Sequence, residues 1–247
     1  MKYPLALALV ALSSTAMAEE ASRWSAGIGV IQSPSPYIGV DNQNLVFPAV
    51  GYEGKDFYLR GPSAGYYLAK DEQWSLALGL QLGPSRLDPD KSDDQRMKRL
   101  DDRKFSVLGG VRATHKAKWG LLEGTLATDV SGRHDGQYAE LAYKYPVIRN
   151  ARFQLTPGLG LAYYSDDYAD YYYGVSGGES LRSGFAEYHP GSATNSFATL
   201  DMNWKFASQW LAVASLRYTW LDDSLSDSPI VDKDHSTSAY LGLVYRF

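Results

Sequence analysis

The feature that most constrains the fold is the last stretch of the chain, Ser236 to Phe247, which reads STSAYLGLVYRF. In an extended strand, every second residue counted back from Phe247 is apolar, whereas the opposite face mixes arginine, glycine, tyrosine and serine. A water-soluble edge strand is normally blunted by charge, proline or a bulge, and this one is apolar to its last position. The strand therefore either is buried in a soluble sandwich or presents its apolar face to lipid.

The other end of the chain predicts export. Lys2 supplies a positive charge, residues 5–12 are apolar, and Ala16-Met17-Ala18 resembles a signal-peptidase site. We predict a cleaved signal peptide over residues 1–18 and one domain over 19–247, because no linker or shift in composition divides the chain. The apolar stretch is shorter than the roughly 20 residues that a membrane-spanning helix needs, and no later segment comes close.

Composition excludes several classes of function. The chain has no cysteine, so disulfides, thiolate metal sites and a lipid-modified N-terminal cysteine are excluded, and we expect no cofactor. Its formal net charge of −4 argues against nucleic acid as a partner, for which a basic stripe would be expected.

Period-two alternation recurs along the chain, for example in residues 74–82, 153–161 and 198–206. Alternation alone does not tell a soluble barrel from a membrane barrel. The stretch WLAVASLRYTW has Trp210 and Trp220 at the two ends of one face. Ten tilted residues span roughly 25 Å, the height of the apolar band between the aromatic girdles of an outer-membrane barrel.

The connections between these segments predict the number of strands. Short turns occur at 53–55, 71–73, 116–118, 148–151 and 207–209, and longer polar stretches at 32–44, 84–102, 166–195 and 223–237. Short periplasmic turns and long external loops must alternate, and they do so only if Gly61-Pro62 forms a further hairpin. We predict an all-β fold, a single antiparallel transmembrane β-barrel of about twelve strands, with ten as the alternative.

The terminal strand resembles the C-terminal signal by which outer-membrane proteins are recognised for insertion. The matching residues are Tyr240, Gly242, Tyr245 and Phe247. Together with the signal peptide, this resemblance places the protein in the outer membrane of a Gram-negative cell, in contact with its lipid.

A second resemblance is to the MltA-interacting outer-membrane proteins, the MipA/OmpV family. The segment YADYYYGVS at 168–176 resembles the family's Tyr-Tyr-Gly-Val motif, and residues 45–81 and 210–231 are similar to its second to fifth strands and its penultimate strand and loop. The resemblance implies a barrel that scaffolds a lytic transglycosylase and a bifunctional penicillin-binding protein. It also links the chain to adhesion, osmotic response and antibiotic susceptibility.

No catalytic motif emerges from the sequence, and we expect the protein not to be an enzyme. Histidines at 134, 189 and 235 fall in or near loops, and Asp234-His235 could orient a water molecule. None of the spacings forms a motif, so solvated acidic loops that bind divalent cations loosely are the simpler interpretation.

Charged residues of both signs are expected to face the lumen. They are Arg112, Glu123, Asp129, Glu140, Lys144, Asp201, Lys205, Arg217 and Arg246. Charges of both signs favour pairs that fill the barrel over an ion-selective channel, although a channel for small solutes or drugs remains the alternative.

The candidate binding residues lie in the two long loops near the C-terminus. They are Tyr171, Tyr172, Tyr173, Asp166, Asp167, Asp170, Asp223 and Asp227. If both loops are external, their carboxylates form a negative rim that attracts cationic peptides or divalent cations, and the tyrosines supply apolar contact. The alternative is that the tyrosines extend the aromatic girdle or fold into the mouth as a plug, with Gly174 allowing a sharp turn.

Overall fold

The computed structural model describes residues 23–33, 35–40 and 43–247. The predicted signal peptide lies outside these residues and stays a prediction. No helix in the described part of the chain is long and apolar enough to cross a membrane.

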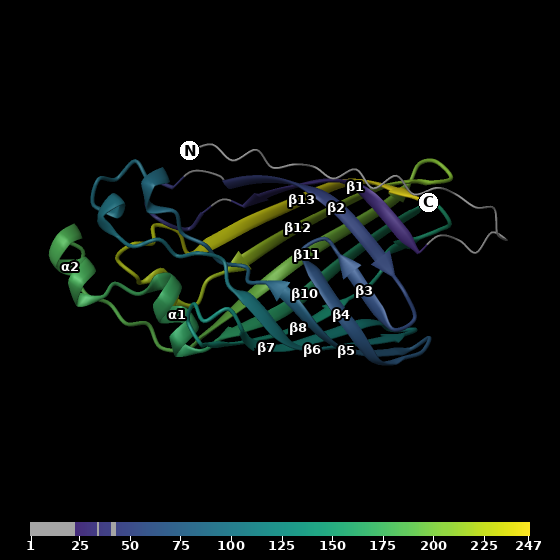
Figure 1. The fold of residues 1–247 in the computed structure, drawn as a ribbon, viewed down its shortest axis with the longest axis horizontal. Coiled ribbons are helices and arrows are strands. Elements are labelled where there is room, and N and C mark those ends of the chain that lie inside the picture. The colour runs from purple at the N-terminus through teal and green to yellow at the C-terminus, as the bar shows by residue number, and fades with distance from the viewer. Residues whose placement is uncertain (1–22, 34, 41–42) are drawn as a thin grey trace.

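The described residues form one meandering sheet with short helices in its loops (Figure 1). The strands are β1 (Trp24–Ser33), β2 (Gln43–Glu53), β3 (Phe57–Arg60), β4 (Ser63–Lys70), β5 (Trp74–Leu82), β6 (Val107–Ala117), β7 (Gly120–Asp129), β8 (Gln137–Lys144), β9 (Ile148–Arg149), β10 (Phe153–Tyr164), β11 (Ala193–Lys205), β12 (Trp210–Trp220) and β13 (His235–Arg246). The helices are η1 (Pro89–Lys91), η2 (Met97–Arg99), α1 (Asp166–Tyr173), α2 (Gly177–Ser183) and α3 (Asp223–Ser226).

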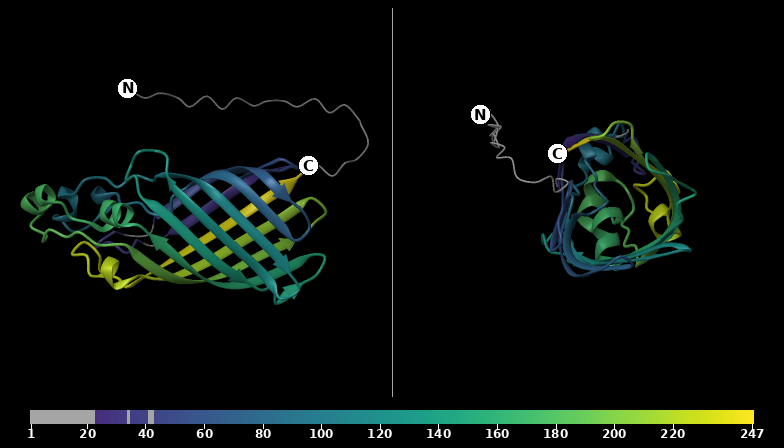
Figure 2. Two further views of the ribbon diagram at one scale, coloured as in Figure 1. Left: turned by 90° about the horizontal axis from the view of Figure 1, so that it is seen from below. Right: turned by 90° about the vertical axis from the view of Figure 1, so that its right-hand side faces the viewer.

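The sheet closes on itself because β13 pairs antiparallel with β1 and β10 pairs with β11 (Figure 2). β9 has two residues and pairs with the start of β10 beside β8, so the wall is a closed barrel of twelve strands with one extra short strand. The predicted twelve-stranded antiparallel barrel is confirmed. Closure leaves no sheet edge at the C-terminal strand, which explains why that strand is not blunted.

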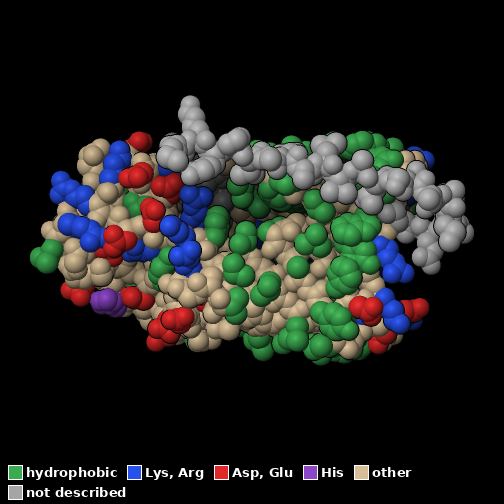
Figure 3. All heavy atoms as spheres, in the orientation of Figure 1, with side chains coloured by type: hydrophobic (Ala, Val, Ile, Leu, Met, Phe, Trp, Pro, Cys, Tyr) green, Lys and Arg blue, Asp and Glu red, His purple; other side chains and the backbone are tan. Residues whose placement is uncertain are grey.

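Residue alternation sorts the wall into an apolar outside and a mixed inside. On β13, Leu241, Leu243 and Phe247 are exposed and point outward, whereas Arg246 pairs with Ser25 on the lumen face. Figure 3 shows hydrophobic and uncharged groups over the middle of the barrel and charged groups gathered towards its two ends. This distribution matches a lipid-facing band between two aqueous faces.

The hairpin of β3 and β4 is the shortest part of the wall. Gly61 has φ 57°, a left-handed conformation that suits glycine in a tight turn, and Pro62 follows it. β3 pairs with β2 only from Gly51 to Glu53, so the part of β2 nearer the external end extends beyond the hairpin (Figure 1). The predicted hairpin at Gly61-Pro62 is confirmed.

Candidate functional site

Four external loops meet over the mouth of the barrel and form what we call the external cap, residues 35–40, 83–106, 165–192 and 221–234. Backbone contacts join them: the N–H of Ile38 donates to the carbonyl of Ile230 at 3.0 Å, and Val40 pairs with Ser92. Viewed from the opposite end, the helices of the cap lie within the outline of the barrel (Figure 2). The main cluster of buried apolar side chains lies in this cap and the upper lumen.

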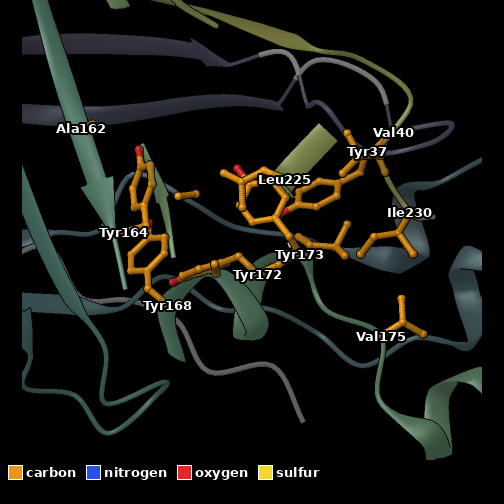
Figure 4. Close-up of a cluster of buried hydrophobic side chains, with 14 of the residues drawn as sticks. Tyr37, Val40, Ala162, Tyr164, Tyr168, Tyr172, Tyr173, Val175, Leu225 and Ile230 are labelled. Carbon is orange, nitrogen blue, oxygen red and sulfur yellow. Dashed lines mark hydrogen bonds between the residues drawn. The ribbon is translucent and has the colours of Figure 1, made fainter. Parts of the chain in front are cut away.

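Tyrosines form the centre of the cap (Figure 4). Tyr37, Tyr168 and Tyr172 are fully buried, and the ring centroids of Tyr168 and Tyr172 lie 4.8 Å apart. The hydroxyl of Tyr172 donates to the carbonyl of Lys104 at 3.0 Å, and the hydroxyl of Tyr37 donates to the carbonyl of Tyr172 at 3.1 Å. Tyr37 thereby satisfies a carbonyl in the last turn of α1 that lacks a partner within the helix.

The three candidate tyrosines are therefore packed inside the cap and do not form an exposed contact surface. Tyr172 and Tyr173 are buried, and Tyr171 is partly buried, with its hydroxyl accepting the N–H of Lys104 at 3.1 Å. This arrangement is the plug that was the alternative interpretation. Gly174 follows α1 with a φ of −74°, which any residue can adopt. Glycine is needed here because a Cβ would collide with the carbonyl of Asp170, which lies close to the backbone of Gly174. A role of these tyrosines in binding a partner stays a prediction.

A buried ion pair fastens α2 to the loop 83–106. Arg103 and Glu179 are 2.7 Å apart, with side chains only 7% and 4% exposed. Arg103 also donates to the carbonyl of Asp101, and Glu179 accepts the N–H groups of Asp101 and Ser176. Burial raises the pKa of Glu179, but these N–H groups and the charge of Arg103 lower it by more, so the pKa lies below its usual value.

Sequence reasoning missed both members of this pair. A signal for Glu179 was present, because Ser176 and Glu179 have the spacing of a capping box, and both of its hydrogen bonds form at the start of α2. Nothing in the spacing of residues links Arg103 to Glu179.

The acidic candidates are dispersed over the cap. Asp166 and Asp167 occupy the first turn of α1, where a negative charge suits the helix dipole, and Asp223 begins α3. Asp170 contacts His189 at 2.7 Å. Figure 3 shows basic groups interspersed with acidic ones at this end, among them those of the loop 83–106. The rim is thus mixed in charge in the view shown, and binding of cations by Asp166, Asp167, Asp170, Asp223 and Asp227 stays a prediction.

Two of the histidines contact carboxylates. His235 contacts Asp234 at 2.7 Å and stacks on Tyr218, and His189 lies between Asp170 and Glu187, whose hydrogen bonds raise its pKa. The residues that the structure describes contain no group of three or more acidic or histidine side chains placed to hold a metal ion.

His134, on the external loop between β7 and β8, is buried against the cap, where its ring packs on Tyr168, Tyr171 and Tyr172. Its Nδ1 accepts the N–H of Gly136 at 3.0 Å, which leaves Nε2 as the protonated nitrogen. Burial lowers the pKa of His134.

Below the cap, one side of the lumen is crossed by charge pairs. Lys144 lies 3.0 Å from Glu123 and 3.1 Å from Asp201, and Arg217 on β12 reaches Glu140 on β8 at 2.9 Å. Glu123 lies on β7, beside β8, but the Lys144–Asp201 and Arg217–Glu140 pairs join strands that are not neighbours, so these two pairs fill the lumen. The predicted inward orientation of the nine charged residues agrees with the strand register.

The residues of the C-terminal signal are divided between the two faces. Tyr245 and Phe247 face outward, and their rings meet edge to face at 5.2 Å. Tyr240 and Gly242 face the lumen, and the ring of Tyr240 lies over Gly242, where a Cβ would collide with it. Recognition of these residues during insertion stays a prediction.

The fold and these sites define an outer-membrane β-barrel whose external mouth is capped by its own loops. A family model described as MltA-interacting protein MipA matches residues 26–247. The chain belongs to this family.

Two relatives from Escherichia coli strain K12 match nearly end to end. The putative outer membrane protein YiaT is 34% identical over 241 residues, which cover 98% of this chain and 97% of the relative. The MltA-interacting protein is 33% identical over 243 residues, which cover 98% of each. The outer membrane protein OmpV of Vibrio cholerae is 24% identical over 91% of this chain and 87% of its own length. The chain is thus an outer-membrane protein.

Among solved structures, the NanC porin aligns with a TM-score of 0.48 and 12% identity, covering 89% of this chain and all of that one. At this level the likeness carries no functional argument.

Proposed function

We propose that the protein is a noncatalytic scaffold that holds murein-hydrolysing and murein-synthesising enzymes at the periplasmic face of the outer membrane. A relative that is 33% identical over 98% of the chain is named for its interaction with MltA. A lytic transglycosylase is therefore the first partner to test, and a bifunctional penicillin-binding protein is the second.

The observation that carries the proposal is the contrast between the two ends of the barrel. The external mouth is filled by the cap, and charge pairs cross the lumen beneath it. Such a barrel is poorly suited to free diffusion of solutes, which supports a role at the other face.

The turn between β8 and β10 supplies a contact surface at that face. Val147 is 54% exposed and Arg149 is exposed beside it, so the turn presents an apolar group next to a positive charge. Arginine is enriched at protein interfaces and among the residues that carry most of the binding energy, and the apolar side chain beside it adds surface to bury.

The test is capture of a purified lytic transglycosylase by the full-length barrel in detergent. A Val147→Asp, Arg149→Glu variant is expected to lose about tenfold or more in affinity, as at an interface hot spot. The matched control is Leu181→Asp, since Leu181 is 91% exposed on the external cap. Equal capture by all three proteins would exclude this turn as the contact.

A channel for small solutes or drugs is the competing function. Planar-bilayer recordings of the same preparation separate the two functions. If discrete conductance steps accompany a failure to retain either murein enzyme, the channel replaces the scaffold.

A further inference from the structure

A cavity of about 840 Å³ occupies the periplasmic half of the lumen, within the size range of small-molecule sites. It is lined mainly by β1, β2, β12 and β13, and it extends sideways past Val50 and Leu59 to Gly61 and Pro62 at the tip of the β3–β4 hairpin. The charge pairs of Lys144 and Arg217 are not part of its lining.

Much of the wall of this cavity is apolar, on a face where a barrel is usually polar, although Ser25 and Asn203 also line it. Its lumen-facing residues include Ile31, Phe47, Ala49, Leu211, Val213 and Val244. The same strands are also apolar towards the membrane, so these segments present apolar side chains on both faces. Leaving such a wall against water costs about 25 cal/mol for each Å² of apolar surface, which favours an apolar occupant.

Two glycines keep the upper part of the cavity open. The rings of Phe47 and Tyr240 are stacked 6.1 Å apart and lie over Gly29, where a Cβ would come within 2.9 Å of both rings. Gly242, the partner of Gly29 across the β1–β13 pair, makes room for Tyr240 in the same way. Because the rings lie against the wall, space remains beside them.

The periplasmic mouth of the cavity is positively charged. Arg23 and Arg246 line it, and in the described part of the chain neither forms an ion pair with a carboxylate. Glu53, the acidic residue of the lining, is compensated by Arg60 and Lys70. An anionic group at this mouth would therefore meet two guanidinium groups that pair with no carboxylate of the described residues.

The wall beside the cavity is open to one side of β2. The carbonyl of Val50 accepts the N–H of Gly61, and above that contact no strand of the described residues pairs with β2 on this side. Pro48 lies two residues before Val50, on the same edge of β2. Because proline has no backbone N–H, no donor is left unpaired there. A lipid chain could reach the cavity here without breaking backbone hydrogen bonds.

We propose that this cavity binds a single-chain anionic amphiphile, a fatty acid or a lysophospholipid. The chain lies along the apolar wall towards Phe47 and Tyr240, and the head group lies between Arg23 and Arg246. The apolar wall and the positive charge of the mouth both match this chemistry. The proposal is independent of the scaffold function, since it concerns the lumen and not the periplasmic turns.

The test is titration of the delipidated full-length barrel, held in an uncharged amphipol, with oleate and with oleoyl lysophosphatidic acid, followed by calorimetry. Saturable binding is expected for at least one probe. Oleate alone would identify free fatty acids, and the lysolipid alone would identify products of phospholipid cleavage. Binding of neither probe would overturn the proposal.

Two variants locate the site. Ala49→Phe fills the cavity and is expected to abolish binding, with heat-modifiable migration on gels as the check on folding. Arg23→Gln, Arg246→Gln is expected to weaken binding of oleate about tenfold or more and to leave oleyl alcohol unaffected. Lys205→Gln is the control, because Lys205 faces the lumen at the same end but does not line the cavity. Unchanged affinity in the folded Ala49→Phe barrel would refute the assignment.

Discussion

The two ends of this barrel are filled differently. At the external end, close-packed tyrosines fill the mouth, and a buried ion pair with its hydrogen bonds satisfied fastens the cap above it. At the periplasmic end a cavity of about 840 Å³ remains, with a largely apolar wall and a charged mouth. The charge pairs of Lys144 and Arg217 lie between these two regions.

The length of the connections accounts for the difference. The lumen of a barrel with more than eight strands is wider than the wall side chains alone can fill. External loops such as 165–192 supply enough chain to form helices and pack a second core, whereas periplasmic turns such as 71–73 supply none. The wall residues alone therefore decide what the periplasmic half holds.

The largest expected effect comes from breaking the ion pair of the cap. Glu179→Ala leaves Arg103 buried without its partner, and the loss is about 3–5 kcal/mol in the stability of the closed cap. Hydrogen exchange of the α2 amides is expected to accelerate while the strands stay protected. The control is Glu187→Ala, since Glu187 is exposed and its carboxylate pairs with the exposed His189. Equal protection in both variants would mean that the tyrosine core alone holds the cap.

A smaller effect is expected in the middle of the lumen. Lys144→Met leaves Glu123 and Asp201 without their shared cation and is expected to destabilise the barrel by about 1–2 kcal/mol, less than a fully buried pair because the site is partly solvated. Lys70→Met is the control, because Glu53 keeps Arg60 and the hydroxyl of Tyr67. Urea midpoints in lipid vesicles measure both, and a larger shift for Lys70→Met would contradict the comparison.

The smallest effect is a loosening of the cap in acid. Because the pKa of His134 is lowered in the folded state, its contribution is complete above about 6.5, the unfolded value, and is lost as the pH falls towards the folded pKa. Glu179 also has a lowered pKa, so its contribution to stability is lost as the pH falls, but only below about pH 4.5. The exposed His189 has a raised pKa and acts in the opposite direction: its contribution is complete below about pH 6.5 and is lost as the pH rises.

Limited proteolysis of the cap between pH 7.5 and 5 measures this effect. The cleavage rate is expected to rise with acidity in the wild type and to change less in His134→Gln. A parallel rise in both proteins would assign the acid response to another group.

Much of the wall was predictable from local patterns. Alternation, the Gly61-Pro62 turn and the parity of loop lengths predicted the twelve strands, because the pleat of a strand and the closure of a sheet impose those rules on any sequence. The lumen-facing charges followed from the same alternation. The cap was not predictable in this way, because Tyr37, Lys104 and Tyr172 meet only through loops that are far apart in the sequence.

The sequence by itself determined which side of each strand faces lipid, where the strands turn and that the last strand needs a partner, since these depend on neighbours one or two residues apart. Only the tertiary structure decided that the tyrosine motif is buried, that Arg103 pairs with Glu179 and that the apolar lumen residues of β1, β2, β12 and β13 surround one cavity. Those outcomes depend on which segments face each other across the closed barrel, and closure brings together residues that no local pattern relates.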